Sequence, residues 1–329
     1  MQVNILPVPS EPIGSHFSKT IPALQTALDA TSISLFKECP RKYYYKQVLG
    51  WERQNNEHHL IFGQHIHSAL EFFDHKMAEG MDRESAIRAT VRYTLEISGE
   101  RNPDGSFVPW RSLDPKNQKT RESLVRTVVW YLEQFNPDVF ETLILKNGKP
   151  AVELSFKVDT QLPAPDGEHY IISGHLDRVV RYADQLWVVD RKTTGSALTS
   201  YFFDGFNPNT QMSLYSCVST LVLGEACAGV IIDAAQILVD STRFQRGFSP
   251  RTATQRDEFW EGLLNQTIPA IERAAETQRW PMNETACGNY GGCPFREVCS
   301  ADPSVREKIL QTRFTKKIWN PLENRGGND

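Results

Sequence analysis

Residues 174–194 decide the fold, and they read Gly-His-Leu-Asp-Arg-Val-Val-Arg-Tyr-Ala-Asp-Gln-Leu-Trp-Val-Val-Asp-Arg-Lys-Thr-Thr. Apolar runs at positions 171–180 and 186–189 predict two strands, and the polar stretch 183–185 between them predicts a hairpin turn. Side chains alternate between the two faces of a strand, so Asp190 and Lys192 should project from one face, roughly 6–7 Å apart along the strand. A carboxylate and an ammonium group therefore leave one edge of the sheet together.

A second carboxylate, that of Asp177 on the neighbouring strand, can reach the same point. With the backbone carbonyl of Arg191, the two acids would form the oxygen-rich site that hard divalent cations prefer. An Asp-x-Lys triplet at the end of a strand is, taken alone, usually a solvated surface pair. The motifs on either side of it favour the functional interpretation.

Motifs of the same kind follow one another along the chain, in the order Gly63-x3-His67, Gly174-x2-Asp177, Asp190-x-Lys192 and Gln211-x3-Tyr215. This order resembles that of the PD-(D/E)xK nuclease superfamily, in particular its RecB-like branch. The resemblance covers residues 32–299 and implies an α/β, restriction-endonuclease-like core in which helices flank a central mixed sheet. It also implies a metal-dependent DNA nuclease, most commonly an exonuclease in DNA recombination, repair or processing. The competing class is a non-catalytic DNA-end binding or scaffold protein that retains the nuclease fold.

The resemblance assigns roles to the residues of these motifs. Asp177 and Asp190 would bind Mg²⁺ or Mn²⁺ directly, and the Arg191 carbonyl would add a third oxygen. The His67 imidazole would join them and favour manganese. A lone histidine on a helix is more often structural. Only its place in the Gly-x3-His motif makes His67 a candidate metal ligand. Lys192 would lie beside the attacking water, either as general base or as a charged stabiliser.

Three further polar residues are candidates for the same site. Gln211 and Tyr215 lie one turn apart on an expected helix, where they can hydrogen-bond a phosphate or hold Lys192 in place. Glu153 lies on a strand expected at residues 152–158, where members of the family often carry an acid that supports the metal. The alternative for Glu153 is the solvated face of an edge strand, and the sequence weighs the two equally.

The chain has 329 residues, 40% of them hydrophobic and 23% charged, as in an ordinary globular protein. No apolar run approaches the roughly 18 residues of a membrane span, and no secretory signal is visible, so we expect a cytoplasmic protein. The net charge of −4 does not indicate nucleic-acid binding, although a local basic groove and metal ions can still meet phosphates. The resemblance implies DNA as partner, as a single strand or a duplex end. The sequence contains no Gly-x4-Gly-Lys-Ser/Thr phosphate loop, so any helicase or recombination partner would be a separate protein.

Three of the six cysteines crowd into Cys287-x5-Cys293-x5-Cys299. A reducing cytoplasm argues against disulfides, so the group suggests thiolate ligands for a metal. Structural zinc usually draws on two close cysteine pairs, whereas iron–sulfur clusters accept irregular spacings. Nucleases of the AddB type and the iron–sulfur exonucleases associated with CRISPR adaptation are similar in combining three such cysteines with one near the N-terminus, here Cys39. The similarity implies a [4Fe-4S] cluster that staples the two ends of the domain, with structural zinc and free thiols as alternatives.

Two other features bear on this resemblance. The five-residue spacer after Cys287 departs from the Cys-x2-Cys of many relatives. Residues 32–45 look like the N-terminal signature of RecB-like nucleases, and we interpret the tyrosines at 43–45 as core, and Arg41 and Lys42 as solvated charges or contacts to a DNA backbone. The aromatic side chains at 130, 131 and 135 fit either a core or a lid over a groove, with the core favoured.

We expect one nuclease domain at residues 31–299, with a helical insertion at 84–150 and the cysteine cluster at 287–299. Residues 1–30 are expected to form an N-terminal arm or tail, and residues 300–329 a C-terminal tail. Ser32 is the expected N-cap of the first helix, and Asn207 that of a helix ending at Leu223. Further expectations are helices at 60–79, 82–99, 117–135 and 252–276, strands at 229–237 and 243–248, and loops at 102–115 and 193–205.

Overall fold

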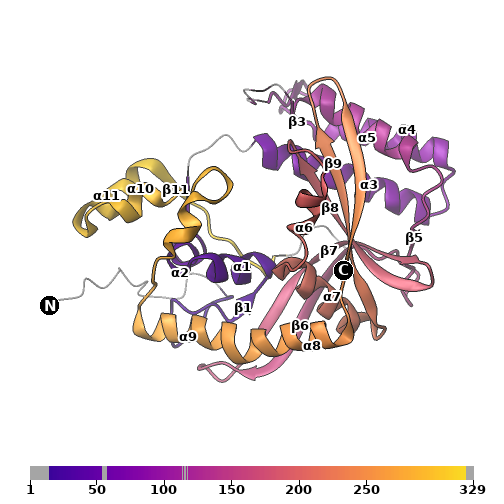
Figure 1. Cartoon of the computed structure of the whole chain (residues 1–329). Coiled ribbons are helices and arrows are strands. Elements are labelled where there is room, and N and C mark those ends of the chain that lie inside the picture. Colours follow the sequence, from indigo (N-terminus) through magenta and orange to yellow (C-terminus); the bar gives the residue numbers. More distant parts are fainter. Residues whose placement is uncertain (1–14, 54–57, 113, 115, 117, 324–329) are drawn as a thin grey trace. The chain divides into compact units, whose positions relative to one another are not determined.

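The computed structural model describes residues 15–53, 58–112, 114, 116 and 118–323 (Figure 1). Its internal contacts divide the chain into two compact units. The first comprises residues 1–55, 155–174 and 254–329, and the second comprises residues 56–154 and 175–253. Strands β6 (Val152–Pro163) and β7 (His169–Tyr182) contribute residues to both. The predicted nuclease site falls in the second unit, and the predicted cysteine cluster falls in the first.

A mixed sheet forms the second unit, and its central strands are buried along most of their length because they are runs of aliphatic residues. Strand β7 pairs antiparallel with β8 (Gln185–Thr194), β8 pairs parallel with β9 (Cys227–Ile237), and β9 pairs antiparallel with β10 (Thr242–Pro250). The short strand β5 (Glu141–Thr142) also pairs with β7. The mixed α/β architecture predicted from the sequence is confirmed.

The predicted hairpin between β7 and β8 is also confirmed. Tyr182 pairs with Gln185, which leaves Ala183 and Asp184 as a two-residue turn. Their φ angles of 49° and 60° are the positive values of a type I′ turn, which suits the right-handed twist of the flanking strands. Asp184 tolerates this conformation because a short polar side chain can bond locally.

Helices of the second unit are α3 (His58–Ala78), α4 (Arg83–Ile97), α5 (Arg121–Gln134), α6 (Ser200–Asp204) and α7 (Thr210–Leu223) (Figure 1). The first three correspond to the helices predicted at 60–79, 82–99 and 117–135. Phe62, Ile66 and Leu70 recur at helical spacing on α3, and they pack in one buried core with Leu124 of α5 and Ile237 of β9. This core holds α3 against the sheet.

Aromatic residues 130, 131 and 135 of the second unit serve mainly as core, as favoured from the sequence. Tyr131 is buried in the core that α3 shares with the sheet, and Phe135 packs against it. Trp130, by contrast, is 38% exposed.

Local predictions in this unit are wrong at one helix cap and in two loops. The N-cap of α7 is Asn209 rather than Asn207, because the Asn209 side chain accepts hydrogen bonds from the amides of Gln211 and Met212. The expected loops at 102–115 and 193–205 contain short elements, namely strand β4 (Phe107–Pro109), which pairs with β3 (Gly99–Arg101), and helix α6. Elements this short carry too little periodicity to be seen in a sequence.

The first unit gathers elements from both ends of the described chain. Its N-terminal part consists of β1 (Ala27–Leu28), α1 (Ala30–Glu38), α2 (Pro40–Tyr43), a π-helical turn (Tyr44–Val48) and β2 (Trp51–Arg53). Its C-terminal part consists of α8 (Ala253–Gly262), a π-helical turn (Leu263–Thr267), α9 (Ile268–Thr277), a 3₁₀ segment (Glu284–Gly291), α10 (Arg296–Ser300), α11 (Pro303–Arg313) and β11 (Phe314–Lys316). Strand β11 pairs antiparallel with β2, which joins the two parts.

Aromatic packing holds the first unit together. Tyr44 stacks on Trp280 with ring centroids 5.1 Å apart, Tyr45 packs against Phe295, and Phe295 stacks on Phe314 at 5.1 Å. Tyr43, Tyr44 and Tyr45 are all buried, so the core interpretation of this run is confirmed. The neighbouring Arg41 and Lys42 both bind groups of the protein itself. Arg41 Nε donates to the Trp280 carbonyl, and Lys42 Nζ lies 2.8 Å from Glu38 Oε2.

Several expectations for the first unit differ from the structure. Helix α1 is capped by Asp29 rather than Ser32, because Asp29 Oδ1 accepts from the Ser32 amide at 2.7 Å. Within the predicted arm, β1 pairs in parallel with β7, while residues 1–14 lie outside the described part. The helix expected at 252–276 is interrupted by a π-helical turn. The predicted C-terminal tail contains α11 and β11, and its last residues, 324–329, again lie outside the described part.

None of the helices within the described ranges is long and apolar enough to cross a lipid bilayer.

Candidate metal and catalytic site

The candidate site begins where β7 and β8 stop pairing. The paired register runs as far as Arg178 opposite Val189. One residue earlier on β7, Oδ2 of Asp177 accepts a hydrogen bond from the backbone N–H of Arg191 at 2.8 Å. A side-chain oxygen thus satisfies an amide beyond the end of the backbone ladder. This bond fixes the Asp177 carboxylate against the strand that carries the Asp-x-Lys motif.

Helix α3 brings His67 to the same carboxylate. His67 Nδ1 lies 3.4 Å from Asp177 Oδ2. Gly63, one turn earlier, faces β8, and a Cβ at this position would lie 3.5 Å from Oγ1 of Thr193. An alanine would therefore just fit, whereas a longer side chain would push the helix away from the strand. The Gly-x3-His spacing thus has a physical cause.

Glu153 completes a group that can hold a cation. One ligand atom each from His67, Glu153 and Asp177 lies within 4.8 Å of the other two. The strict alternation predicted for residues 152–158 is wrong at this point, because Glu153 has a φ of 45° and so departs from strand geometry. A left-handed conformation costs a non-glycine residue about 1–2 kcal/mol, and such strain concentrates at functional positions. The departure accompanies the placement of the Glu153 carboxylate beside His67 and Asp177.

The chemistry of this donor set fits a divalent cation. Two carboxylates suit hard ions such as Mg²⁺, and an imidazole favours a transition metal such as Mn²⁺. Among the described residues, the group within 4.8 Å does not include Asp190, which was predicted as a direct ligand.

Asp190 instead belongs to a polar chain with the residues of α7. Oδ2 of Asp190 lies 2.7 Å from Nζ of Lys192, which also donates to Oε1 of Gln211 at 3.2 Å. Nε2 of Gln211 in turn donates to the hydroxyl of Tyr215 at 3.0 Å. The four residues of the last two motifs are therefore connected, and they hold the Lys192 ammonium on two sides.

The charges of the site act strongly on one another. Burial works against the Asp177 carboxylate, but His67 and Lys192 outweigh it and hold its pKa well below the usual range. Burial also raises the pKa of Glu153, which the nearby Asp177 and Glu71 carboxylates raise further, to about 7. Burial alone would lower the pKa of Lys192, yet Asp190 and Asp177 outweigh it and raise that pKa. Lys192 is accordingly held as an ammonium ion at neutral pH, and Glu153 retains its proton more readily than an ordinary carboxyl.

Glu71 was missed in the sequence. It lies on α3 one turn after His67, so the two share a face of the helix. Burial raises the pKa of Glu71, and the charge of Asp177 acts in the same direction. The signal that could have found this fourth acid is the His67-x3-Glu71 spacing.

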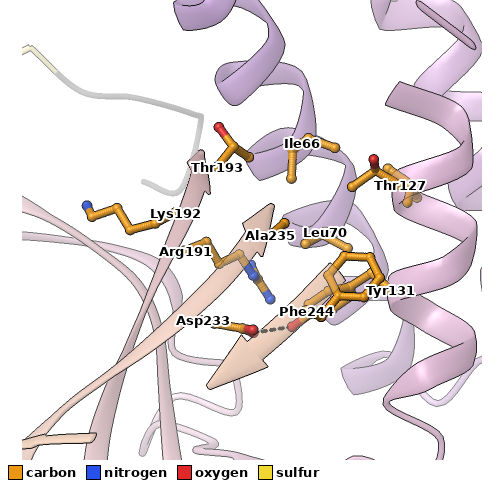
Figure 2. A pocket seen from close by; sticks show the side chains of 11 residues that line it. Ile66, Leu70, Thr127, Tyr131, Arg191, Lys192, Thr193, Asp233, Ala235 and Phe244 are labelled. Atoms are coloured by element: carbon orange, nitrogen blue, oxygen red, sulfur yellow. Dashed lines mark hydrogen bonds between the residues drawn. The ribbon is translucent and has the colours of Figure 1, made fainter. Parts of the chain in front are cut away.

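The face of β8 opposite to Lys192 carries different groups. Figure 2 shows Arg191 and Lys192 projecting from opposite sides of the strand, with the Arg191 guanidinium directed toward Asp233 and Tyr131. These residues line a cavity of about 10 Å³, which is at most the size of one water. The Tyr131 hydroxyl donates to Asp233 Oδ2. A cavity of this size has no room for a ligand larger than a water molecule.

Thiols from both ends of the chain meet in the first unit. The Asn283 amide donates to Sγ of Cys39 at 3.4 Å, and the Asn283 carbonyl lies 4.0 Å from Sγ of Cys287. The amide of Cys293 donates to the Cys287 carbonyl at 3.0 Å. Burial raises the pKa of Cys299 to about 11, with Cys293 and Cys39 among the neighbours that raise it. Asn283 thus links Cys39 to Cys287, and Cys287 contacts Cys293, but among the described residues no three of these sulfur atoms lie within 4.8 Å of one another.

All six cysteines lie in the described part, and none of them forms a disulfide there. Cys217 and Cys227 are buried, as predicted for small apolar side chains outside the cluster.

Two distant likenesses are among the solved structures that resemble this chain. A candidate exonuclease from Eubacterium rectale is 11% identical, with a TM-score of 0.40 over 80% of this chain and 86% of its own. The protein SSO0001 is 15% identical, with a TM-score of 0.20 over 39% of this chain and 48% of its own. A search of curated proteins finds no match. The family model of the PD-(D/E)XK nuclease superfamily matches residues 27–300, which include every residue of the site described above. The chain therefore belongs to the PD-(D/E)XK nuclease superfamily.

Proposed function

We propose that the protein is a metal-dependent deoxyribonuclease that hydrolyses phosphodiester bonds, and that it works as an exonuclease on a single strand or a duplex end. One observation carries the proposal. The ligand atoms of His67, Glu153 and Asp177 lie within 4.8 Å of one another, in a chain of a nuclease superfamily that uses divalent metals. A set of one imidazole and two carboxylates is suited to Mn²⁺ and also accepts Mg²⁺.

His67, Glu153 and Asp177 are the proposed ligands of this ion, and Asp190 and the Arg191 carbonyl are proposed to complete its shell. A divalent cation bound there supplies Lewis-acid stabilisation of the phosphate and a water of lowered pKa. Asp177 enters as a carboxylate, since its depressed pKa keeps it ionised at neutral pH. Glu153 must release its proton to bind a cation.

Lys192 is proposed as the cation that meets the phosphate. Its raised pKa favours the charged stabiliser over the general base. Asp190 and Gln211 orient the ammonium, and Tyr215 orients Gln211. The phosphate thus finds a preorganised positive charge, which needs no rearrangement as negative charge develops on the reacting oxygens.

A finer assignment concerns the branch of the superfamily and the cysteines. We place the protein in the RecB-like branch, with a [4Fe-4S] cluster held by Cys39, Cys287, Cys293 and Cys299 and structural zinc as the alternative. The contacts of Asn283 with both Cys39 and Cys287 support a shared metal. This branch points to DNA recombination or repair, with any helicase supplied by another protein.

Digestion of end-labelled DNA tests the proposed activity. Single- and double-stranded substrates are incubated with Mn²⁺, Mg²⁺ or EDTA, and wild type is compared with Asp177→Asn. Metal-dependent loss of full-length DNA that Asp177→Asn abolishes is the expected result. DNA binding without cleavage in any metal would instead identify a scaffold protein that retains the nuclease fold. Successive products one nucleotide apart indicate an exonuclease, and internal fragments would contradict that part.

A further inference from the structure

Asp74 of helix α3 contacts both strands that carry the site. Oδ2 of Asp74 lies 2.5 Å from Nη2 of Arg191, and Oδ1 lies 3.9 Å from Nε of Arg178. The three residues are between 4% and 6% exposed. A carboxylate and two guanidinium groups are thus buried together within the second unit.

These contacts connect Asp74 to the proposed metal ligands through the backbone. Arg191 directly follows Asp190 on β8, and Arg178 directly follows Asp177 on β7. Neighbouring side chains on a strand point to opposite faces, as Figure 2 shows for Arg191 and Lys192. The contact of Asp74 with each arginine therefore also constrains the backbone of the acid that precedes that arginine.

Helix α3 also carries His67, seven residues before Asp74. Seven residues are close to two helical turns, so both side chains face the sheet. His67 reaches Asp177, and Asp74 reaches Arg191 two turns further on. The helix is thereby fixed to the strand pair at two points, which determine how far the imidazole lies from the carboxylates.

Arg178 has other support, so Arg191 depends more on Asp74. Arg178 Nη1 lies 2.9 Å from Oδ2 of Asp138, and its Nη2 donates to the Phe140 carbonyl at 2.8 Å. Arg191 Nη2 donates to Asp74, while Nε of Arg191 has no hydrogen-bond partner among the described residues. Loss of Asp74 should therefore make the position of β8 less well fixed than that of β7.

We infer that Asp74 is a positioning residue, which sets the spacing between His67 and the strand carboxylates by holding Arg191 and Arg178. The inference rests on the proposed metal site, because it assigns Asp74 a part in the affinity of that site. Asp74 itself neither binds the ion nor touches DNA. Removal of residues that orient metal ligands typically costs 10–100-fold in metal affinity, and we expect a loss of this size for Asp74→Asn.

The experiment measures Mn²⁺ affinity and thermal unfolding of the full chain, with free Mn²⁺ followed by its electron paramagnetic resonance signal. Asp74→Asn should bind Mn²⁺ about 10–100-fold more weakly, with every ligand still present. Leu124→Ala is the matched control, since Leu124 is fully buried in the core that holds α3 against the sheet and carries no polar group. It should lower the unfolding temperature and leave Mn²⁺ affinity unchanged.

A double variant separates positioning from stability. Replacing a buried ion pair with apolar side chains often restores stability, so Asp74→Leu/Arg191→Met should unfold at a higher temperature than Asp74→Asn. Its Mn²⁺ affinity should stay low, because the ionic contact between α3 and β8 is still missing. Wild-type affinity in Asp74→Asn, or recovery of both properties in the double variant, would overturn the inference. Absence of Mn²⁺ binding by the wild type would overturn the proposed function itself, which is a different result.

Discussion

Nζ of Lys192 lies 2.7 Å from Oδ2 of Asp190, and both groups come from one strand two residues apart. Asp190 is 2% exposed, so its carboxylate is shielded from water, whereas the Lys192 side chain is 30% exposed. This arrangement makes Asp190 an anchor of Lys192 as much as a ligand for an ion. The contact with Asp190 also holds the Lys192 ammonium in position before any substrate binds.

Lys192→Ala should lower turnover by about 10²–10⁴-fold, the usual contribution of one positioned proton-transfer or charge-stabilising group. DNA binding should persist, because the proposed role of Lys192 concerns the reacting phosphate. Turnover is measured on end-labelled DNA with Mn²⁺, and binding by fluorescence anisotropy with EDTA. Lys76→Ala is the control, since Lys76 also pairs with a carboxylate at 2.7 Å but lies outside the proposed site. Unchanged turnover in Lys192→Ala would remove it from the mechanism.

Glu153→Gln should weaken Mn²⁺ binding by at least tenfold while leaving the metal-free protein as stable or more stable. The carboxylate is a proposed ligand, and changes even behind the ligands cost 10–100-fold. The Glu153 pKa of about 7 indicates that the metal-free site disfavours a charged carboxylate at this position. At a pH above this pKa, the neutral amide of glutamine therefore removes an unfavourable interaction. Affinity is measured by titration calorimetry and stability by urea unfolding at pH 8. Glu84→Gln, on the exposed surface of α4, should change neither. A Glu153→Gln protein that binds Mn²⁺ normally would exclude Glu153 as a ligand.

The sequence predicted one half of this site better than the other. Asp190 and Lys192 followed from strand alternation, and the hairpin placed Asp177 beside them, because both rules depend only on regular geometry. Glu153 could not be placed in this way, since its positive φ is a local departure that no pattern announces. Residues two or three positions apart also compete as helix caps, and both Asp29 and Asn209 were passed over for nearby residues of similar chemistry.

The buried ionic group next to the site could not be predicted from the sequence either. Asp74, Arg178 and Arg191 are charged residues that would normally be assigned to the surface, yet each is almost fully buried. Their mutual neutralisation depends on tertiary packing between α3 and two strands, which hydrophobic periodicity does not encode. A seven-residue spacing between His67 and Asp74 is the one hint that they share a face.

Mn²⁺ affinity should rise with pH through about 7. Without metal, the Glu153 pKa is about 7, and the Asp177 carboxylate raises the pKa of His67 although burial opposes this. A metal ion needs the deprotonated carboxylate and the neutral imidazole, so protons compete with it below these pKa values and cease to compete above them. Titration calorimetry in two buffers of different ionisation enthalpy should show proton release near pH 6.5 and less near pH 8.5. In Glu153→Gln the released fraction should fall, with the part due to His67 remaining. Affinity and proton release that stay constant from pH 6 to 8.5 would contradict this account.

Cys39→Ala should remove the proposed cluster, whereas Cys217→Ala should not. Both cysteines are buried and form no disulfide in the described part, but only Cys39 contacts the segment that carries Cys287. Purified anaerobically, the wild type should be brown and absorb near 400 nm, as thiolate-ligated iron–sulfur clusters do. Cys39→Ala should lose this absorbance and its iron, and should unfold at a lower temperature, because the cluster crosslinks distant parts of the first unit and limits the unfolded chain. A colourless wild type with one bound zinc would show a structural zinc site instead of a cluster. A metal-free wild type would show that the four thiols hold no metal. Equal iron content in Cys39→Ala and Cys217→Ala would exclude Cys39 as a ligand.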